Sequence, residues 1–294
     1  MKKFASIFSS ILSKLWSLVP FRINLCLGKV LAFLWVDVFQ IRKKVIFNNL
    51  DLVFPNLTYD EKKRISIKSM QNMCRSFFDI LKIPSLTDAW IEKNVIFDGL
   101  DNFKLAKSQE KGILFLSLHL GSGDLGGAIM SQKLLPVYII TKKIKNKFLN
   151  YFWFNMRGAS NTQFIDAHSK KNAFEILGAI KKQAGVVFVL DQFMGKPYGI
   201  LTNFFGKPTG TAYGLALFAK KTQSPVVPVC TYWDNNDVFH ICFGQSIDLS
   251  NLFSDNGSSY ITNATNRFNE ELEKMILQHP EHWMWVHRRW KDFE

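Results

Sequence analysis

The sequence predicts an α/β fold in which helices flank a mostly parallel central sheet, with an N-terminal apolar helix that anchors the chain to a membrane. The first observation is that four short apolar runs alternate with helical stretches between residues 113 and 232, as buried parallel strands do. The second is that the first forty residues are apolar but repeatedly interrupted by charges. The third is the composition: 47% hydrophobic and 21% charged residues over 294 positions are typical of a folded protein and exclude disorder, collagen and a coiled coil.

The net charge of +13 is concentrated in two segments. Residues 1–50 hold eight basic residues against Asp37 alone, which gives +7, and residues 141–157 hold five basic residues and no acidic one. A basic chain rich in Phe and Trp suits an apolar, anionic partner such as a lipid surface. Nucleic acid is the competing interpretation, and we do not expect it because no nucleic-acid-binding motif accompanies the charge.

The window Ile23–Ile41 is the strongest membrane candidate. It is long enough to span a bilayer, since about 20 residues suffice, but Lys29 and Asp37 each cost roughly 2.5–3.5 kcal/mol near the bilayer centre. A helix in the interface, with Arg22 and Lys29 on one face, is the alternative, and a buried packing helix is the third. We expect membrane attachment, by a spanning or a monotopic helix, with the basic cluster 42–44 on the cytoplasmic side.

A capping-box pattern, Thr58-x-x-Glu61, begins the first helix of the remaining chain. We expect this helix to run to about Leu81, because Pro84 closes it. The continuous apolar runs then predict buried strands at 113–118, 137–141, 186–190 and 226–232.

Helical stretches separate and follow these strands, near 124–134, 170–183, 210–221 and 259–278. Residues 238–243 follow the last strand so closely that we expect a hairpin partner there. The chain is therefore expected to divide into a basic and apolar membrane anchor (1–45), a helical segment that packs on the main domain (46–98) and an α/β domain (99–294).

Polar side chains gather where two of the predicted strands end. The first strand runs into His119 and Asp124, and strand 186–190 runs into Asp191 and Gln192. Ligands of open α/β sheets bind at the carboxyl ends of the strands. Glycines 121 and 123 permit a turn that lets His119 and Asp124 converge, although in a regular helix they would lie about 140° apart. A histidine beside a carboxylate is the usual apparatus for taking a proton from a hydroxyl, and a purely structural loop is the alternative.

These motifs make the chain resemble the lysophospholipid-acyltransferase superfamily, whose hallmark is H-x4-D/E after a strand, and in particular the bacterial lipid A late acyltransferases (lauroyl- and myristoyltransferases). The motifs cover almost the whole chain in the family's order: Asn49-Leu50, Phe54-Pro55, His119-Leu120-Gly121 with Asp124, Asp191-Gln192, Phe204-Phe205-Gly206, and Pro280-x-x-Trp283-x-Trp285-x-His287-Arg288-Arg289-Trp290. The chain departs from the family at Ser122-Gly123-Asp124, where Asn-Trp-Glu is usual, and the missing Trp alters the expected pocket wall.

The resemblance implies a glycerol-3-phosphate-acyltransferase-like fold that transfers a fatty acyl chain from acyl-acyl carrier protein to a hydroxyl of an anionic, Kdo-bearing lipid A precursor. The expected place is the cytoplasmic face of a bacterial inner membrane, without a metal and without any cofactor besides the acyl donor. The positive segment 141–157 would then meet the acidic carrier or the lipid precursor, a solvated loop being the alternative. An acyltransferase for another membrane glycolipid or phospholipid, and an inactive membrane-surface binding protein, stay open.

The resemblance also assigns roles to residues. His119 becomes the general base and Asp124 the carboxylate that orients it, with Asp191 as a second candidate for that role. Arg157 is expected to bind the anionic substrate or stabilise developing charge, a surface ion pair being the alternative. The remaining expected substrate-site residues are Gln192, Phe204 and Phe205, although two aromatics in a row are more often core residues.

Overall fold

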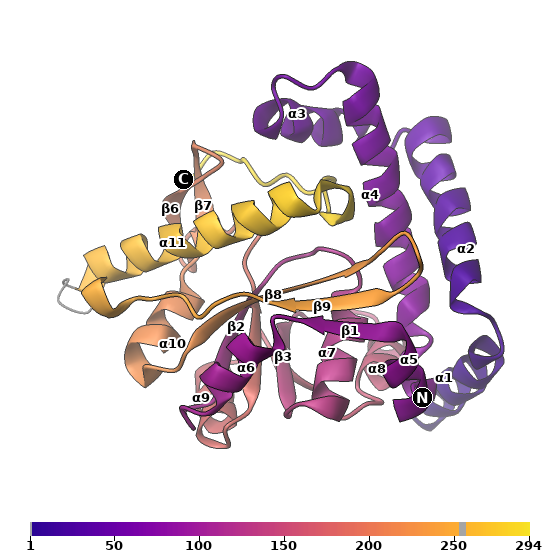
Figure 1. Cartoon of the computed structure of the whole chain (residues 1–294), viewed down its shortest axis with the longest axis horizontal. Helices are drawn as coiled ribbons and strands as arrows, with labels where there is room; N and C mark the ends of the chain where they lie inside the picture. Colours follow the sequence, from indigo (N-terminus) through magenta and orange to yellow (C-terminus); the bar gives the residue numbers. More distant parts are fainter. Residues whose placement is uncertain (1, 253–256) are drawn as a thin grey trace.

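A computed structural model of the chain describes residues 2–252 and 257–294 and has a seven-stranded sheet with helices on both faces (Figure 1). The strand order is β1-β9-β8-β2-β5-β3-β4, and every neighbouring pair is parallel except β8 and β9. The strands are β1 (Val95–Asp98), β2 (Ile113–Ser117), β3 (Val137–Thr141), β4 (Gln163–Asp166), β5 (Gly185–Val189), β8 (Val226–Trp233) and β9 (Phe239–Phe243). The mostly parallel α/β fold is confirmed, and so is the β8–β9 hairpin.

Two hydrophobic clusters pack on the two faces of the sheet. Alternate residues of β2 point to opposite sides, so Leu114 and Leu116 join one cluster while Ile113 and Phe115 join the other. The first face is covered by α9 (Asn172–Lys181), α10 (Gly214–Thr222) and α11 (Gly257–Gln278), and the second by α5 (Asp88–Asn94), α6 (Leu100–Lys107), α7 (Gly123–Lys133) and α8 (Lys147–Arg157). Burial on both faces explains why the strands read as continuous apolar runs.

The helix predicted from the capping box is α4 (Tyr59–Ile80). The backbone N–H of Glu61 donates to the Thr58 hydroxyl at 3.4 Å, and the Thr58 N–H donates to the Glu61 carboxylate at 2.8 Å. The 3-10 turn η2 (Ile83–Ser85), which contains Pro84, follows the helix as expected. The short helix α3 (Lys43–Val53) precedes α4.

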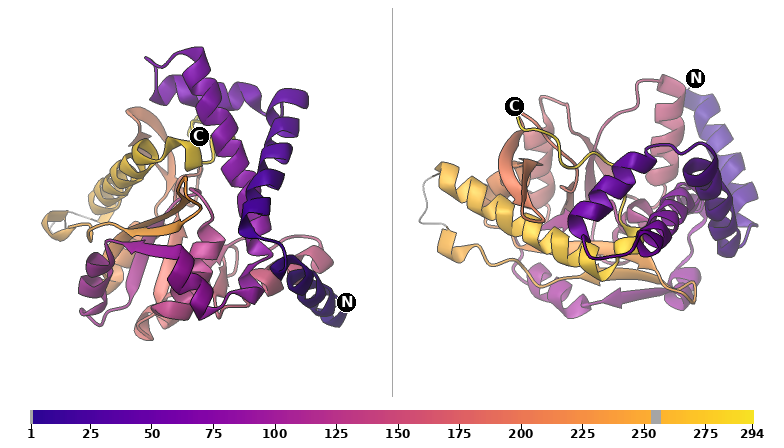
Figure 2. Two further views of the ribbon diagram at one scale, coloured as in Figure 1. Left: turned by 45° about the vertical axis from the view of Figure 1, so that its right-hand side comes forward. Right: turned by 90° about the horizontal axis from the view of Figure 1, so that it is seen from above.

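The N-terminal segment forms two helices with a sharp bend between them (Figure 2). These are α1 (Lys2–Ser17) and α2 (Phe21–Phe33), the second passing into a π-helical turn, η1 (Leu34–Val38). No single helix in the described part of the chain has the length and apolarity to cross a membrane, whereas the pair 6–17 and 21–38, bent by 104°, passes that test together. The window Ile23–Ile41 is therefore not one straight helix.

A second, two-stranded sheet was not predicted. It joins β6 (Gly199–Phe204) to β7 (Lys207–Ala212) in antiparallel pairing. The sequence predicts a helix over 210–221, but α10 begins only at Gly214, so the start of that predicted helix is wrong. The Thr211 hydroxyl accepts a hydrogen bond from the buried Arg289 guanidinium at 2.7 Å, a tertiary contact that holds this segment extended.

The edge strand β1 comes from the segment 46–98 that the sequence reads as helical, and it pairs with β9. The strands β1 and β4 and the helix α8 have no counterpart among the predicted elements. The division into segments 1–45, 46–98 and 99–294 stays a prediction.

Candidate active site

The candidate site lies where two neighbouring parallel strands end. β2 and β5 pair in register, with Ser117 opposite Val189, and the N–H of Leu190 donates to the Ser117 carbonyl at 3.1 Å. The chain continues from these positions to His119 and to Asp191, so the sheet itself brings the two side chains together. This is the strand edge at which the sequence predicts a site.

Asp191 is the direct partner of His119. Nδ1 of the imidazole lies 2.8 Å from Oδ1 of the carboxylate. The other oxygen, Oδ2, accepts hydrogen bonds from the His119 backbone N–H at 3.1 Å and from the Trp283 indole N–H at 2.8 Å. Burial by itself raises the pKa of Asp191, but His119 and the hydrogen bonds outweigh it and hold that pKa below the ordinary value.

This arrangement leaves Nε2 of His119 as the basic atom. With Asp191 ionised, Nδ1 carries the proton that it shares with the carboxylate, so the lone pair is on Nε2. The His119 side chain is 42% exposed, which gives a reacting hydroxyl access to it. Desolvation of the ring disfavours the cation, but the charge and hydrogen bond of Asp191, with a smaller effect from Asp124, raise the pKa of His119. The Gln192 amide nitrogen lies 3.4 Å from Nδ1, next to the ring.

Asp124 contacts Arg157 instead of His119. Two nitrogens of the guanidinium, Nε and Nη2, lie 2.7 Å and 2.6 Å from Oδ1 of Asp124. Arg157 is buried, and its guanidinium lies over the ring of Phe164 at 4.6 Å from the centroid. The ion pair that was the alternative for Arg157 is present but buried, and its expected binding of an anionic substrate stays a prediction. Asp124 acts on His119 through its charge only.

A tight turn separates His119 from α7. Gly121 has a φ of +65°, and a Cβ atom there would lie 2.0 Å from the Thr231 carbonyl oxygen. The N–H of Gly121 donates to the His282 carbonyl at 3.1 Å, and the Thr231 hydroxyl donates to the Leu120 carbonyl at 3.2 Å. This glycine therefore supplies both the left-handed backbone and the close approach of β8 that the turn requires.

The C-terminal segment completes the site from the other side. The N–H of Met284 donates to the His119 carbonyl at 3.1 Å, and Trp283 forms an isolated β-bridge with Leu120. Trp283 thus contacts Asp191 through its indole and Leu120, the residue after His119, through its backbone. From the sequence, Trp283 is expected to be an interface or packing residue. The signal that could have assigned it to the site is its place in the ordered C-terminal motif.

Two helices that lie far away in the sequence hold this C-terminal segment. The Ser69 hydroxyl of α4 donates to the Trp283 carbonyl at 2.5 Å. The Asn49 amide of α3 donates to the carbonyls of Trp285 and His287, each at 2.8 Å. Asn49 therefore has a physical reason to belong to the ordered motif set, which the sequence alone does not provide.

The other predicted site residues lie at different distances from the chemistry. Phe204 is fully buried and packs between Trp283 and Trp290, with ring centroids 6.1 Å and 5.7 Å away, so it belongs to the core. Phe205 is half-buried in the β6–β7 turn at a φ of +50°. The lysines of the segment 141–157 are all exposed, and Lys143 forms an ion pair with Asp166 at 3.1 Å.

The C-terminal histidines are packing residues. His279 stacks on Tyr232 with centroids 4.0 Å apart. Burial lowers the pKa of His282 to about 3 and that of His287 to about 4, so both are neutral at physiological pH. Within residues 2–252 and 257–294, no group of three or more His, Cys, Asp and Glu side chains is arranged to hold a metal ion.

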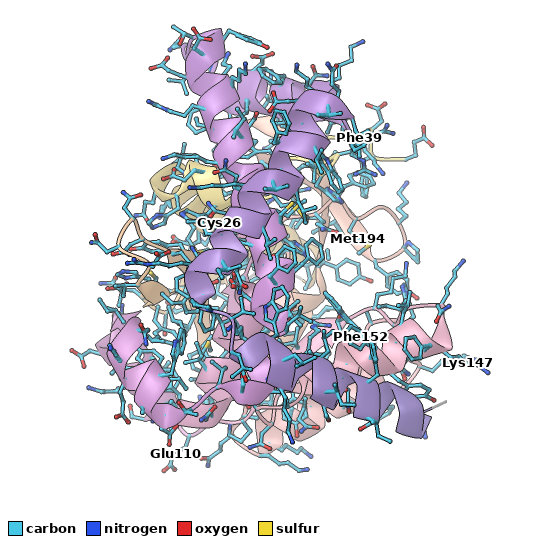
Figure 3. The ribbon with its side chains drawn as sticks, turned by 90° about the vertical axis from the view of Figure 1, so that its right-hand side faces the viewer. Cys26, Phe39, Glu110, Lys147, Phe152 and Met194 are labelled. Carbon is cyan, nitrogen blue, oxygen red and sulfur yellow. The ribbon has the colours of Figure 1, made fainter. Side chains whose placement is uncertain are left out.

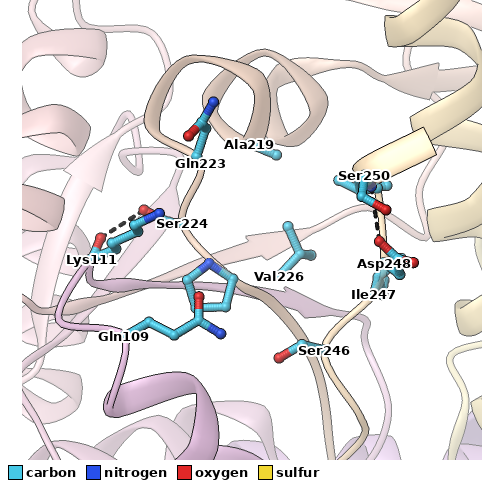
Figure 4. Close-up of a pocket in the computed structure, with 12 residues that line it drawn as sticks. Gln109, Lys111, Ala219, Gln223, Ser224, Val226, Ser246, Ile247, Asp248 and Ser250 are labelled. Atoms are coloured by element: carbon cyan, nitrogen blue, oxygen red, sulfur yellow. Dashed lines mark hydrogen bonds between the residues drawn. The ribbon is translucent and has the colours of Figure 1, made fainter. Parts of the chain in front are cut away.

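A cavity of about 500 Å³ lies where strands β2 and β8 begin, at the end of the sheet opposite to His119 (Figure 4). Its lining includes Lys111 and Pro225, which precede β2 and β8, whereas His119 follows β2. The Ser224 hydroxyl donates to the Lys111 carbonyl there at 2.7 Å. This cavity is remote from the His119–Asp191 pair, and we assign it no part in the chemistry.

Comparisons with known proteins show which family the chain is similar to. A family model described as bacterial lipid A biosynthesis acyltransferase matches residues 2–292. The chain is 24% identical over 280 residues to the lipid A biosynthesis palmitoleoyltransferase of Escherichia coli (strain K12), an alignment that covers 94% of this chain and 88% of that protein. It is also 24% identical over 287 residues to the lipid A biosynthesis lauroyltransferase of the same organism, with 94% and 89% covered. A lipid A biosynthesis acyltransferase of Haemophilus influenzae is 22% identical over 240 residues, with 81% and 72% covered.

Proposed function

The chain belongs to the bacterial lipid A biosynthesis acyltransferases, and on that premise we propose that it moves a fatty acyl chain from acyl-acyl carrier protein to a hydroxyl of a Kdo-bearing lipid A precursor. The observation that carries the proposal is the His119–Asp191 pair, with 2.8 Å between Nδ1 and the carboxylate and with Nε2 left as the base. The names of the relatives support the substrate class. Because relatives at the same identity are named for different acyl chains, the proposal leaves the chain length open.

In the proposed reaction, Nε2 of His119 takes the proton of the acceptor hydroxyl while the hydroxyl oxygen attacks the thioester carbonyl carbon. A C–O bond forms, and the C–S bond breaks as the tetrahedral intermediate collapses. The imidazolium gives its proton to the departing thiolate, so the products are the new ester and the free carrier thiol. Asp191 stabilises the transient imidazolium and fixes its tautomer, the role of a buried carboxylate beside a catalytic histidine.

Asp124 and Arg157 support this chemistry at longer range. The charge of Asp124 favours the imidazolium, and Arg157 holds the carboxylate with a hydrogen bond from Nε at 2.7 Å and an ion-pair contact from Nη2 at 2.6 Å. Since the Arg157 guanidinium is buried between Asp124 and aromatic rings, we assign it a positioning role. We propose that the substrate approaches His119 past two side chains. These are Gln192, which lies beside the imidazole, and the half-buried Phe205.

We propose that the enzyme attaches to the cytoplasmic face of the inner membrane through its bent N-terminal pair, in a monotopic manner. α1 carries Ile7, Ile11 and Leu15, and Leu18 follows its last residue; each of these side chains is more than half exposed. α2 packs along α4 through Asn24, Gly28 and Ala32, which are buried at four-residue intervals. A bent helix pair that packs on the protein through α2 and leaves apolar side chains of α1 exposed suits the interface between lipid and protein.

The replacement His119→Ala tests the catalytic assignment. With purified enzyme, acyl-acyl carrier protein and a Kdo-bearing lipid A precursor, we expect product formation to fall by at least about 10²-fold, because a positioned general base contributes roughly 10²–10⁴-fold. The variant should stay folded and membrane-bound. His168→Ala, an exposed histidine after β4, is the matched control and should keep full activity.

Other outcomes would redirect the proposal. Retained activity in His119→Ala would contradict the mechanism. Accumulation of a different glycolipid in a deletion strain, read by mass spectrometry, would assign another acceptor. Failure of the unaltered enzyme to form product from active donor would indicate a binding protein.

A further inference from the structure

The carboxylate of Asp79, near the end of α4, is fully buried and binds three side chains from three other parts of the fold. Its Oδ1 accepts from the Asn24 amide of α2 at 2.9 Å. Its Oδ2 accepts from the Ser122 hydroxyl at 2.5 Å and from the Trp233 indole N–H of β8 at 3.0 Å. An ionisable group in such a place is costly unless its hydrogen bonds are satisfied, so these bonds hold the surrounding elements together.

Arg75 provides the opposite charge. Its Nε lies 4.0 Å from Oδ2 of Asp79, and its guanidinium lies 3.9 Å above the Trp233 ring. Burial raises the pKa of Asp79, and Arg75 and the three donors oppose that rise. Arg75 also reaches Asp237 at 3.3 Å, which extends the network to the β8–β9 hairpin.

The network connects the N-terminal helices to the catalytic turn. The Trp16 indole of α1 donates to the Asn24 side-chain oxygen at 3.2 Å, and the Asn24 amide donates to Asp79. Asp79 in turn binds Ser122, which is three residues after His119 and two before Asp124. Four side chains thus form a continuous hydrogen-bonded line from α1 to the catalytic turn.

On the α7 side of Ser122, at Gly123, the turn is not held by packing. A Cβ atom built on Gly123 meets nothing within 4 Å, so the position after Ser122 faces open space. The preceding residues are held by β8 and by the C-terminal segment, and Asp124 is held by Arg157. Ser122 is therefore the point where the turn is secured from the side of α4.

We propose that Asp79 is a positioning residue that fixes the catalytic turn 119–124 to α4 and to the bent N-terminal helix pair. It does not touch substrate; it sets the geometry of His119 and Asp124 through Ser122, and Asn24 makes that geometry depend on the position of the N-terminal pair. This inference rests on the proposed acyl transfer. A misplacement of about 1 Å can reduce a rate by about 10²-fold, so loss of the bond should be visible in turnover.

The test compares two buried serines. Ser122→Ala removes the hydroxyl that binds Asp79, and Ser224→Ala removes one that joins the starts of β2 and β8 at the opposite edge of the sheet (Figure 4). We expect Ser122→Ala to lower kcat by about tenfold or more with KM within about twofold. Ser224→Ala should lower the melting temperature about as much as Ser122→Ala does, and it should leave kcat unchanged.

Two further variants define the roles of the partners. Ser122→Thr keeps a hydroxyl and should recover kcat to within about threefold of the unaltered enzyme. Asn24→Ala breaks the line to α1 and should lower kcat while the protein still floats with lipid vesicles. If Ser122→Ala and Ser224→Ala affect kcat equally, or if Asn24→Ala leaves kcat unchanged, the proposal is overturned.

The failure of this inference is distinguishable from the failure of the proposed function. An unaltered enzyme without acyl transfer, or an active His119→Ala variant, would remove the proposed function. An active enzyme that loses activity in His119→Ala but shows no selective effect of Ser122→Ala would remove the role of Asp79 alone.

Discussion

At the scale of single residues, the two oxygens of Asp191 have different tasks. Oδ2 accepts from the His119 N–H and the Trp283 indole, both of which can only donate, while Oδ1 faces Nδ1 of His119. An asparagine at this position must place its carbonyl oxygen where Oδ2 was, so its NH₂ group would face Nδ1. The imidazole would then carry its proton on Nε2, which makes it unable to act as a base.

We therefore expect Asp191→Asn to lower the plateau of kcat/KM by at least about 10²-fold. In the unaltered enzyme, kcat/KM should rise with pH around a midpoint above 6.5, because the raised pKa of His119 keeps the ring protonated to higher pH. Loss of the carboxylate charge should move the remaining rise to lower pH. A pH profile of both proteins checks this, with the exposed Asp101→Asn as control; an unshifted midpoint would contradict the pairing.

The two glycines of the catalytic turn should respond in opposite ways to alanine. At Gly121 the left-handed backbone costs about 1–2 kcal/mol and the contact with the Thr231 carbonyl at 2.0 Å adds overpacking, so we expect Gly121→Ala to lose about 2–5 kcal/mol of stability. Gly123 begins α7 and faces open space, so Gly123→Ala should be neutral or stabilise by up to about 1 kcal/mol. Denaturant unfolding of both variants measures the contrast, and equal losses would contradict it.

Sequence reasoning could predict the location of the site but not which carboxylate binds His119. The H-x4-D spacing pointed to Asp124, whereas the partner is Asp191, 72 residues away from His119 in sequence. That pairing depends on β2 and β5 being neighbours in register, a property of the sheet order that no local pattern contains. The Trp283–Asp191 bond depends in the same way on how the C-terminal segment folds back.

At the scale of elements, the strands that the sequence predicts correctly are those buried on both faces, because such strands are continuous apolar runs. β2, β3, β5 and β8 form the buried centre of the sheet, and each was predicted to within one residue at either end. The strands missed, β1 and β4, are the two edges of the sheet, where one side faces no strand and the apolar signal is weak. The β6–β7 hairpin was missed because a buried arginine and threonine hydroxyls stabilise it, and these leave no hydrophobic pattern.

The bent N-terminal pair shows the same division between local and tertiary information. Its apolar composition predicts contact with lipid. The sequence does not show, however, that Asn24, Gly28 and Ala32 form the stripe on α2 that packs against α4. A Cβ on Gly28 would lie 2.7 Å from the Gln71 carbonyl, so the two helices approach more closely than larger residues allow. The pair is thus part of the folded protein as well as an apolar surface.

At the scale of the whole molecule, the fold brings the two basic segments of the chain together. α1 packs on α8, where Asn155 of α8 donates to the hydroxyl of Ser9 at 2.8 Å and the Phe8 and Phe152 rings lie 5.8 Å apart (Figure 3). Lys147 is therefore at the start of a helix that packs against α1, which exposes apolar side chains, and Lys142, Lys143 and Lys145 precede it in the chain. An apolar stripe next to basic side chains is the combination that binds an anionic leaflet.

Neutralising these lysines should weaken attachment without affecting the fold. Lys142→Gln, Lys145→Gln and Lys147→Gln together remove three charges, each contributing about 1 kcal/mol near an anionic surface, so we expect roughly a hundredfold weaker binding to phosphatidylglycerol vesicles at low salt. Lys171→Gln, Lys181→Gln and Lys182→Gln, which change the net charge equally but lie on and around α9, are the control and should bind nearly as the unaltered protein. Vesicle flotation at increasing salt measures both sets. Equal weakening by the two sets would mean that net charge, and not the α1–α8 surface, directs the protein to the membrane.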